Sequence, residues 1–146
     1  MEEMNQLKVF KADEVNQLLP KLTEMIQELQ EKRELIVAQE VEIDALEIVT
    51  EAKEDNASPL IHRKIESYNQ TVNRFYEIID EMHEIGCLLK DVDSGLVDFY
   101  AIHEGRVVYL CWKLGEKKIR FWHEVGKGYA YRQPLAHEHD GLESSG

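Results

Sequence analysis

An unbroken heptad repeat of apolar residues constrains this chain more than any other feature of its sequence. The repeat has alternating spacings of four and three, at Ile61, Ile65, Tyr68, Val72, Phe75, Ile79 and Met82. This spacing puts the apolar side chains on one narrow stripe of an α-helix, and such a stripe requires a partner helix. Ser58 and Pro59 precede the repeat and favour a helix start there. We therefore expect a helix over residues 58–85, roughly 40 Å long.

The segment that begins near Asp13 is the expected partner helix. Its apolar residues follow a less regular three–four alternation, at Val15, Leu18, Leu22, Met25, Leu29, Ile36, Ile43 and Leu46. Pro20 predicts a kink or a restart of this helix near Leu19, because proline removes a backbone donor and clashes with the preceding turn. The acidic stretch 51–55, followed by Asn56, is the expected frayed end of this helix and the loop. Together the two helices predict an antiparallel, coiled-coil-like hairpin over about residues 13–85.

Glycine, aromatic and β-branched residues mark the part of the chain after Gly86. Four short strand candidates follow, at residues 87–90, 96–102, 107–114 and 119–125. The segments 103–106 and 115–117 between them are typical of tight hairpin turns. Val9 and Phe10 are a candidate edge strand. The predicted fold class is therefore α+β, a long antiparallel α-helical hairpin followed by a small antiparallel β-meander over about residues 87–125.

The third candidate strand is apolar on both of its faces. Val107, Tyr109 and Cys111 alternate along it with Val108, Leu110 and Trp112. Either the helices cover one face and a second subunit covers the other, or the sheet curls onto itself. We therefore expect a homodimer.

The length of 146 residues suits one domain, here over residues 1–136. The polar segment 137–146 is the expected disordered tail.

The charge of the chain excludes several classes of partner. Its 29 acidic and 17 basic residues give a formal net charge of −12, which repels nucleic acid and anionic lipid. No apolar run approaches the roughly 18 residues that span a bilayer. The N-terminus lacks a basic segment followed by an apolar one, so no secretion signal is indicated. We expect a cytoplasmic protein in which Cys87 and Cys111 are buried free thiols.

Several short motifs resemble one known family. They are VFKADEVNQLLPKL (residues 9–22), KDVDSGLVDFYA (90–101), GRVVYLCWKLGE (105–116), the Trp122-His123 pair and RQPL (132–135). Their order along the chain is similar to that of an uncharacterised bacterial family, the domain of unknown function 2203. Tyr100 stands where we expect proline in that family, and Tyr131 where we expect glycine. The resemblance implies a one-domain protein of helical-hairpin type and supplies no activity.

Asp98 is the first candidate for chemistry, because it lies within an apolar strand and a buried carboxylate is costly unless it is paired. Arg106, Arg120 or Arg132 is its expected ion-pair partner, and a carboxylate that faces a ligand is the alternative. The nearby segment 91–95 has aspartates at calcium-loop spacing. It lacks the later ligands of such a loop, so a turn closed by aspartate side chains is the better interpretation.

His123 and Cys111 lie on adjacent candidate strands, and His137 and His139 offer further nitrogen ligands. Zinc needs three or four converging ligands, and neither CxxC nor HExxH is present, so we predict no metal site and expect His123 to be hydrogen-bonded within the sheet. Trp112 and Trp122 fit a core or an interface. No phosphate loop or nucleophile elbow occurs, so we predict no catalytic residue and no cofactor.

These patterns favour a non-enzymatic interaction or scaffold module that binds a protein partner or a second copy of itself. They indicate neither nucleic acid nor a membrane as a partner. The alternative is a small-ligand-binding protein or an enzyme with its site on the sheet. The polar and aromatic residues that gather there are Asp98, Trp112, Glu116, Trp122, His123 and Arg132.

Overall fold

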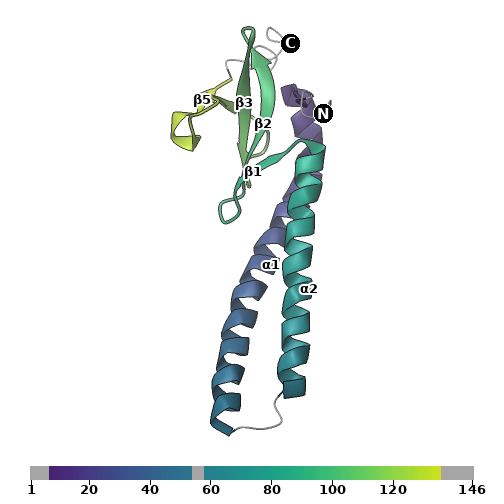
Figure 1. Cartoon of the computed structure of the whole chain (residues 1–146). Coiled ribbons are helices and arrows are strands. Elements are labelled where there is room, and N and C mark those ends of the chain that lie inside the picture. Colours follow the sequence, from purple (N-terminus) through teal and green to yellow (C-terminus); the bar gives the residue numbers. More distant parts are fainter. Residues whose placement is uncertain (1–6, 54–57, 136–146) are drawn as a thin grey trace. The chain divides into compact units, whose positions relative to one another are not determined.

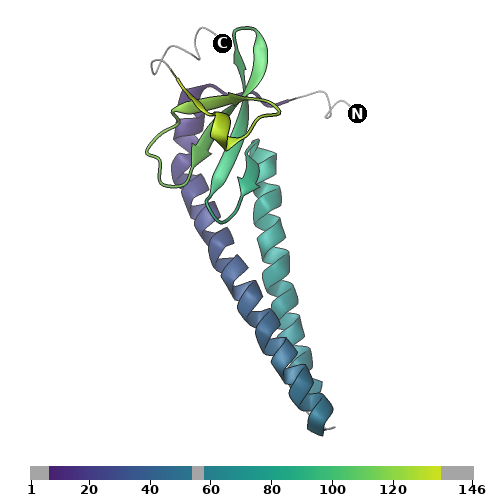
Figure 2. The ribbon, with the colours of Figure 1, turned by 90° about the vertical axis from the view of Figure 1, so that its left-hand side faces the viewer.

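Two long helices precede the sheet in the computed structural model, which describes residues 7–53 and 58–135 (Figures 1 and 2). Helix α1 runs from Ala12 to Lys53 and helix α2 from Ser58 to Ile85. The predicted order of helices is therefore confirmed. Helix α1 ends at Lys53, within the stretch 51–55 that was predicted to hold the helix end and the loop, and the predicted tail at 137–146 lies outside the described residues.

Pro20 lies inside α1, so the helix does not restart near Leu19 as one of the two alternatives held. The proline is exposed, whereas Val15, Leu19 and Leu22 around it are buried. Proline inside a helix costs about 3 kcal/mol. Burial of one large aliphatic side chain contributes roughly 1.5–3 kcal/mol. The three buried neighbours therefore outweigh the lost backbone hydrogen bond.

Five antiparallel strands follow, in the spatial order β1-β2-β3-β4-β5. They are β1 (Leu88–Asp91), β2 (Leu96–His103), β3 (Arg106–Lys113), β4 (Phe121–Glu124) and β5 (Gln133–Pro134). The first four confirm the predicted strands to within about two residues, the usual uncertainty of element ends. β5 was not predicted, because two residues, one of them a proline, carry no periodic signal. A 3₁₀ turn, η2 (Tyr129–Tyr131), precedes it.

The turns follow from residue type. Between β2 and β3, Glu104 and Gly105 both have positive φ, 52° and 79°, which is the conformation of a two-residue type I′ hairpin.

The predicted edge strand at Val9 and Phe10 is wrong. Phe10 donates one backbone hydrogen bond to the carbonyl of Tyr100 (2.8 Å), and no ladder develops beyond it.

The two faces of the sheet differ in chemistry. Val97, Phe99 and Ala101 of β2 share one face with Leu110 and Trp112 of β3, and all five are buried. The Phe10 ring packs edge-on against Phe99 on this face, with the ring centroids 5.1 Å apart. Because side chains alternate along a strand, the neighbouring residues of β2 and β3 face the other way.

Contacts divide the described residues into two compact units. The sheet unit contains the chain up to residue 26 and from residue 81 onward, so it holds the first turns of α1, the last turn of α2 and all strands. Within it the Asn16 side chain of α1 accepts a hydrogen bond from the Ile119 backbone (2.8 Å). The hairpin unit contains residues 27–80, the remaining parts of both helices.

In the hairpin unit the buried stripe of α2 is displaced by one position from the heptad. Phe75 is buried as predicted, but the other buried positions are Thr71 and Ile78. Val72 and Ile79 are half-buried, and Ile65 is 37% exposed. A straight α-helix drifts by about 20° for each heptad, so a strict seven-residue repeat leaves the line of contact. Part of the heptad therefore lies along the edge of the hairpin.

Polar side chains also form contacts between the two helices of the hairpin unit. The antiparallel pairs are Arg74–Glu28 (3.0 and 3.1 Å), Gln39–Ser67 (3.2 Å), Tyr68–Glu40 (2.7 Å) and Lys64–Glu42 (3.0 Å). Most of the charged groups concerned are substantially exposed, so each ion pair contributes roughly 0–1 kcal/mol. They align the two helices more than they stabilise them.

Candidate functional site

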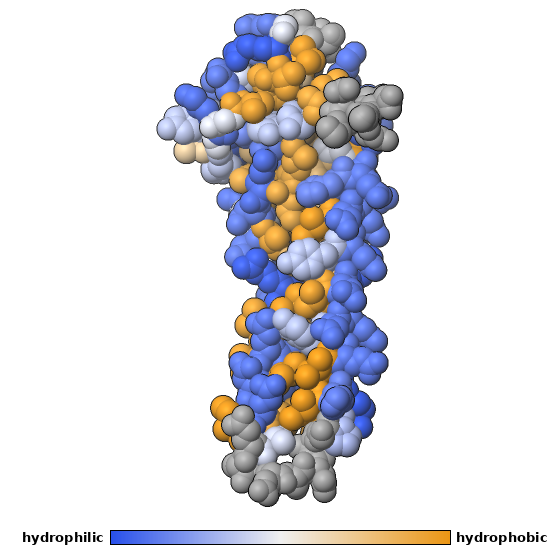
Figure 3. Space-filling view, in the orientation of Figure 1, coloured by the Kyte–Doolittle hydropathy of each residue, from blue (hydrophilic) through white to orange (hydrophobic). Residues whose placement is uncertain are grey.

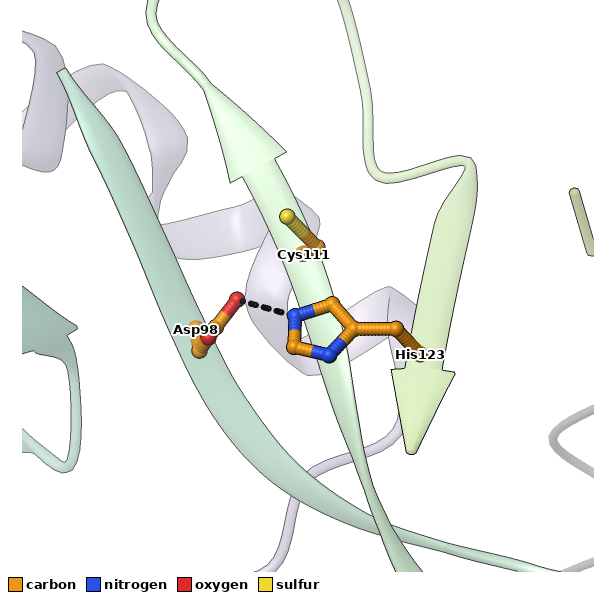
Figure 4. Close-up of side chains that lie close together, drawn as sticks. All are labelled: Asp98, Cys111 and His123. Carbon is orange, nitrogen blue, oxygen red and sulfur yellow. Dashed lines mark hydrogen bonds and ion pairs between the residues drawn. The ribbon is translucent and has the colours of Figure 1, made fainter. Parts of the chain in front are cut away.

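A buried polar cluster lies on the face of the sheet opposite Phe99. Asp98 of β2, Cys111 of β3 and His123 of β4 point toward one another across three adjacent strands (Figure 4). Their exposed fractions are 2%, 0% and 3%. The strand pairing creates the cluster, because Asp98 lies directly opposite Cys111, and His123 lies opposite Tyr109, two residues before Cys111 on the same face.

Both ring nitrogens of His123 are engaged. Nδ1 lies 3.0 Å from the carbonyl oxygen of Glu124, and Nε2 lies 3.2 Å from Oδ1 of Asp98. A carbonyl oxygen only accepts, so the hydrogen of the first bond is on Nδ1. The second bond then holds one proton, shared between Nε2 and the Asp98 carboxyl group. Burial raises the pKa of Asp98, and the neighbouring His123 acts in the opposite direction.

Cys111 completes the cluster as a thiol. Its sulfur lies within 4.8 Å of a carboxylate oxygen of Asp98 and of a ring nitrogen of His123. Burial and the charge of Asp98 raise the pKa of Cys111 to about 12, so at neutral pH it carries its proton. A thiolate is the nucleophilic form of cysteine. The cluster as it stands is therefore not an activated nucleophile, and its histidine is already occupied by the carboxyl group.

Aromatic residues flank the cluster. The Tyr109 ring lies edge-on to His123, with 5.3 Å between the centroids, and Tyr100 lies 5.1 Å from Tyr109. The ammonium group of Lys90 lies 5.0 Å from the Tyr109 ring centroid. Burial raises the pKa of Tyr109 to about 12, so its hydroxyl group is neutral at physiological pH. These groups help to separate the three polar side chains from solvent.

A second polar group shares a residue with the first. Nη2 of Arg132 donates to Oε1 of Glu116 (2.8 Å) and to the backbone carbonyl of Cys111 (3.3 Å). The guanidinium group also lies 3.9 Å from the Phe121 ring centroid and 4.5 Å from that of Tyr129. Its buried Nε has no hydrogen-bond partner among the described residues. Arg132 therefore ties the segment before β5 to β3 and β4.

One comparison with known proteins decides the family. The model of the family described as "Uncharacterized conserved protein (DUF2203)" matches residues 8–135. The chain belongs to this DUF2203 family. Searches of curated proteins and of solved structures find no match. Within the described parts of the chain, neither helix is long and apolar enough to cross a membrane.

The structure of this DUF2203 member separates the six predicted site residues into three sets. Asp98 and His123 meet in the buried cluster, and Glu116 and Arg132 form the second group. Trp112 lies on the opposite face, where its indole nitrogen donates to the carbonyl of Glu116 (2.9 Å). Trp122 is half-buried beside His103, with 4.5 Å between the ring centroids. The two tryptophans do not join the cluster.

The expected arginine partner of Asp98 is wrong. Its partner is His123, while Arg106 pairs with Glu124 (3.3 Å) and Arg132 with Glu116. The alternation of side chains gives the reason, since Asp98 and His123 share a face that Arg106, at the far end of β3, does not reach. The predicted aspartate turn is confirmed, because Oδ2 of Asp91 accepts hydrogen bonds from the backbone (2.8 Å) and the hydroxyl group (2.6 Å) of Ser94.

Cys111 is the member of the cluster that the site prediction omitted. It was interpreted as a buried thiol, which the structure confirms, since both cysteines are free and buried. The signal that could have placed it was the hairpin turn at residues 103–106. A two-residue turn there sets the register and puts Cys111 opposite Asp98.

Proposed function

We propose that this protein is a non-enzymatic interaction module that associates with a second copy of itself through its helical hairpin. The single observation that carries the proposal is an apolar stripe on α1 that α2 does not cover. Val37, Val41 and Ile48 are 54%, 64% and 69% exposed. Aliphatic side chains of this size are normally removed from water when several lie together.

These residues form a continuous line along the helix. Val37, Val41 and Ile48 are spaced by four and seven residues, with Ala45 between them. At 100° per residue, this line lies on the side of α1 opposite Ile43 and Leu46, which are half-buried, and Ile43 lines a pocket together with Leu60 of α2. A helix that is apolar on two opposite sides is typical of one that is buried between two neighbours.

The seam of the hairpin continues onto its surface. Figure 3 shows apolar residues exposed along the line between the two helices, without a polar covering over much of their length. Other exposed aliphatic residues of the hairpin unit are Leu35, Val49, Leu60 and Ile65, which are 43%, 46%, 37% and 37% exposed. The two helices of one hairpin leave these apolar residues accessible to water, whereas a bundle of four helices buries such residues in a common core.

A second copy of the chain is the occupant that these surfaces fit. A two-fold interface needs only one self-complementary patch, and a line of valine and isoleucine satisfies this condition. Helix contacts along residues 27–53 extend over roughly 40 Å. A standard interface buries about 800 Å² on each partner, which a contact of that length between two hairpins provides.

The charge of the hairpin shapes the expected behaviour of the dimer. Residues 27–80 contain 13 acidic and 6 basic residues, so two hairpins repel each other electrostatically. Apolar contact must then supply the association free energy. Salt screens repulsion between exposed charges, so added salt is expected to strengthen the dimer. The free thiols fit a reducing compartment, which we propose to be the cytoplasm.

Sedimentation equilibrium tests the proposal on the full chain. We expect a dimer at micromolar concentration, and at least a tenfold weaker dimer for Val41→Glu combined with Ile48→Glu, since roughly 1.4 kcal/mol is a factor of ten. Gln70→Glu combined with Asn73→Glu adds the same charge at exposed polar positions of the same hairpin and should leave association unchanged. A strict monomer at high micromolar concentration and high salt would contradict the proposal.

A further inference from the structure

We propose that Asp98, Cys111 and His123 form a binding site for a divalent transition-metal ion, with zinc as the first candidate. The inference concerns the sheet unit alone and does not depend on the proposed association of the hairpin. It departs from the interpretation of His123 as a histidine that is only hydrogen-bonded within the sheet. The reason is the convergence of three different ligand atoms in one buried place.

The spacing of the ligand atoms fits one metal ion. A carboxylate oxygen, the Cys111 sulfur and a ring nitrogen of His123 all lie within 4.8 Å of one another (Figure 4). Zinc binds nitrogen and oxygen at about 2.0–2.2 Å and sulfur at about 2.3 Å, so tetrahedral ligand atoms are separated by about 3.3–3.8 Å. The distance of 3.2 Å between Nε2 and Oδ1 is already close to this range. Small rotations of the side chains suffice to admit the ion.

The orientation of His123 is that of a metal ligand. A histidine that coordinates through one nitrogen almost always donates its other N–H to a carbonyl or a carboxylate. Nδ1 of His123 has such a bond to the Glu124 carbonyl (3.0 Å), which fixes the ring and points Nε2 at Asp98. The cross-strand register holds the remaining two ligands on neighbouring strands. All three are therefore positioned by backbone pairing and not by mobile loops.

The donor set selects the class of metal. Sulfur and imidazole donors suit zinc and its neighbours in the first transition row, whereas calcium and magnesium require oxygen ligands. On binding, the ion replaces two protons: the thiol proton of Cys111 and the proton shared by Asp98 and His123. The thiolate and the carboxylate then neutralise the two positive charges. Three protein ligands leave one tetrahedral position for water or another ligand.

Titration with Co²⁺ is the direct test, because cobalt substitutes for zinc and reports its ligands by absorption. The full chain, reduced and first treated with a chelator, should bind one equivalent. Tetrahedral visible bands and a near-ultraviolet band from thiolate-to-cobalt charge transfer should appear, and equimolar zinc should abolish both. Absence of the charge-transfer band at saturating cobalt would overturn the proposal.

Substitutions assign the ligands. Cys111→Ser should abolish the charge-transfer band, and Asp98→Asn and His123→Gln should each weaken binding about a hundredfold or more, beyond what changes in the surrounding shell cost. Replacement of both His137 and His139 by alanine is the matched control, because these histidines offer nitrogen ligands elsewhere in the chain. This control should leave affinity and spectrum unchanged. Loss of the bands in the control, and not in Cys111→Ser, would refute the site.

A measurement on the unaltered chain covers the case in which a variant fails to fold. Free zinc at about 100 times its dissociation constant should raise the melting temperature by about 5–10 °C, because the ion binds the folded state. Magnesium at the same concentration should leave it unchanged. An equal response to both ions, or none to zinc, would contradict a site built from nitrogen, oxygen and sulfur.

Discussion

The two units of this molecule depart from a simple hydrophobic pattern in opposite directions. The sheet unit buries polar groups, with Asp98 and His123 at most 3% exposed, while the hairpin unit exposes Val41 and Ile48 by more than 60%. Buried polar groups are tolerated because each has a partner on a neighbouring strand. Exposed aliphatic groups have no partner within the hairpin unit as described. The proposed self-association of the hairpin rests on this difference.

The largest expected effect comes from breaking the buried pair. Asp98→Ala should lower the free energy of unfolding of the sheet unit by about 3 kcal/mol, because it leaves the buried imidazole of His123 without its partner. Asp44→Ala removes the same group from an exposed position of the hairpin and should change stability by no more than about 0.5 kcal/mol. Urea unfolding in the presence of a chelator, followed by tryptophan fluorescence, measures both. Equal effects would remove the contrast between the units.

An intermediate loss of stability is expected where the guanidinium group of an arginine stacks on aromatic rings. Arg132→Lys keeps the charge near Glu116 but loses the stacking on Phe121 and Tyr129, so it should cost about 1–2 kcal/mol. Arg74→Lys makes the same change in the hairpin, beside Glu28, and should cost about 0.5 kcal/mol or less. Thermal unfolding of the two variants compares them. A larger loss for Arg74→Lys would show that arginine contributes more to stability in the hairpin unit than in the sheet unit.

The smallest effect concerns pH and the hairpin. The hydrogen bond with Arg74 holds the pKa of Glu28 below its ordinary value. A carboxyl group whose folded-state pKa is lowered stabilises the fold above its unfolded-state pKa, and this contribution is lost as the pH falls through the folded-state value. Glu28 is about one-third exposed, so the contribution is only about 0.5 kcal/mol at pH 7.

Glu28→Gln provides the measurement. The difference in unfolding free energy between this variant and the unaltered chain should be about 0.5 kcal/mol at neutral pH and should shrink as the pH falls below about 4. Chemical denaturation at several pH values, at one low ionic strength, records it. A difference that grows on acidification would show that Glu28 is not the stabilised, ionised partner of Arg74.

Particular residues show how far the sequence could predict this protein. The heptad from Ile61 to Met82, the three–four alternation from Val15 to Leu46 and the glycine, aromatic and β-branched residues after Gly86 were sufficient for both helices and four strands, because these signals are local. Pro20 misled the prediction in part, since the burial of its neighbours is a tertiary effect. β5 was missed because its two residues, one of them a proline, carry no periodic signal, and only the fold shows that they pair with Phe121 and Trp122 of β4.

The candidate site depended more strongly on the tertiary structure. Asp98 and His123 were recognised as unusual within apolar strands, but their pairing was not. The sequence by itself determined which segments are amphipathic, because periodicity is written in neighbouring residues. Only the folded chain decided that a carboxyl group, a thiol and an imidazole from three strands meet, because strand register and the choice of face couple residues far apart in the sequence.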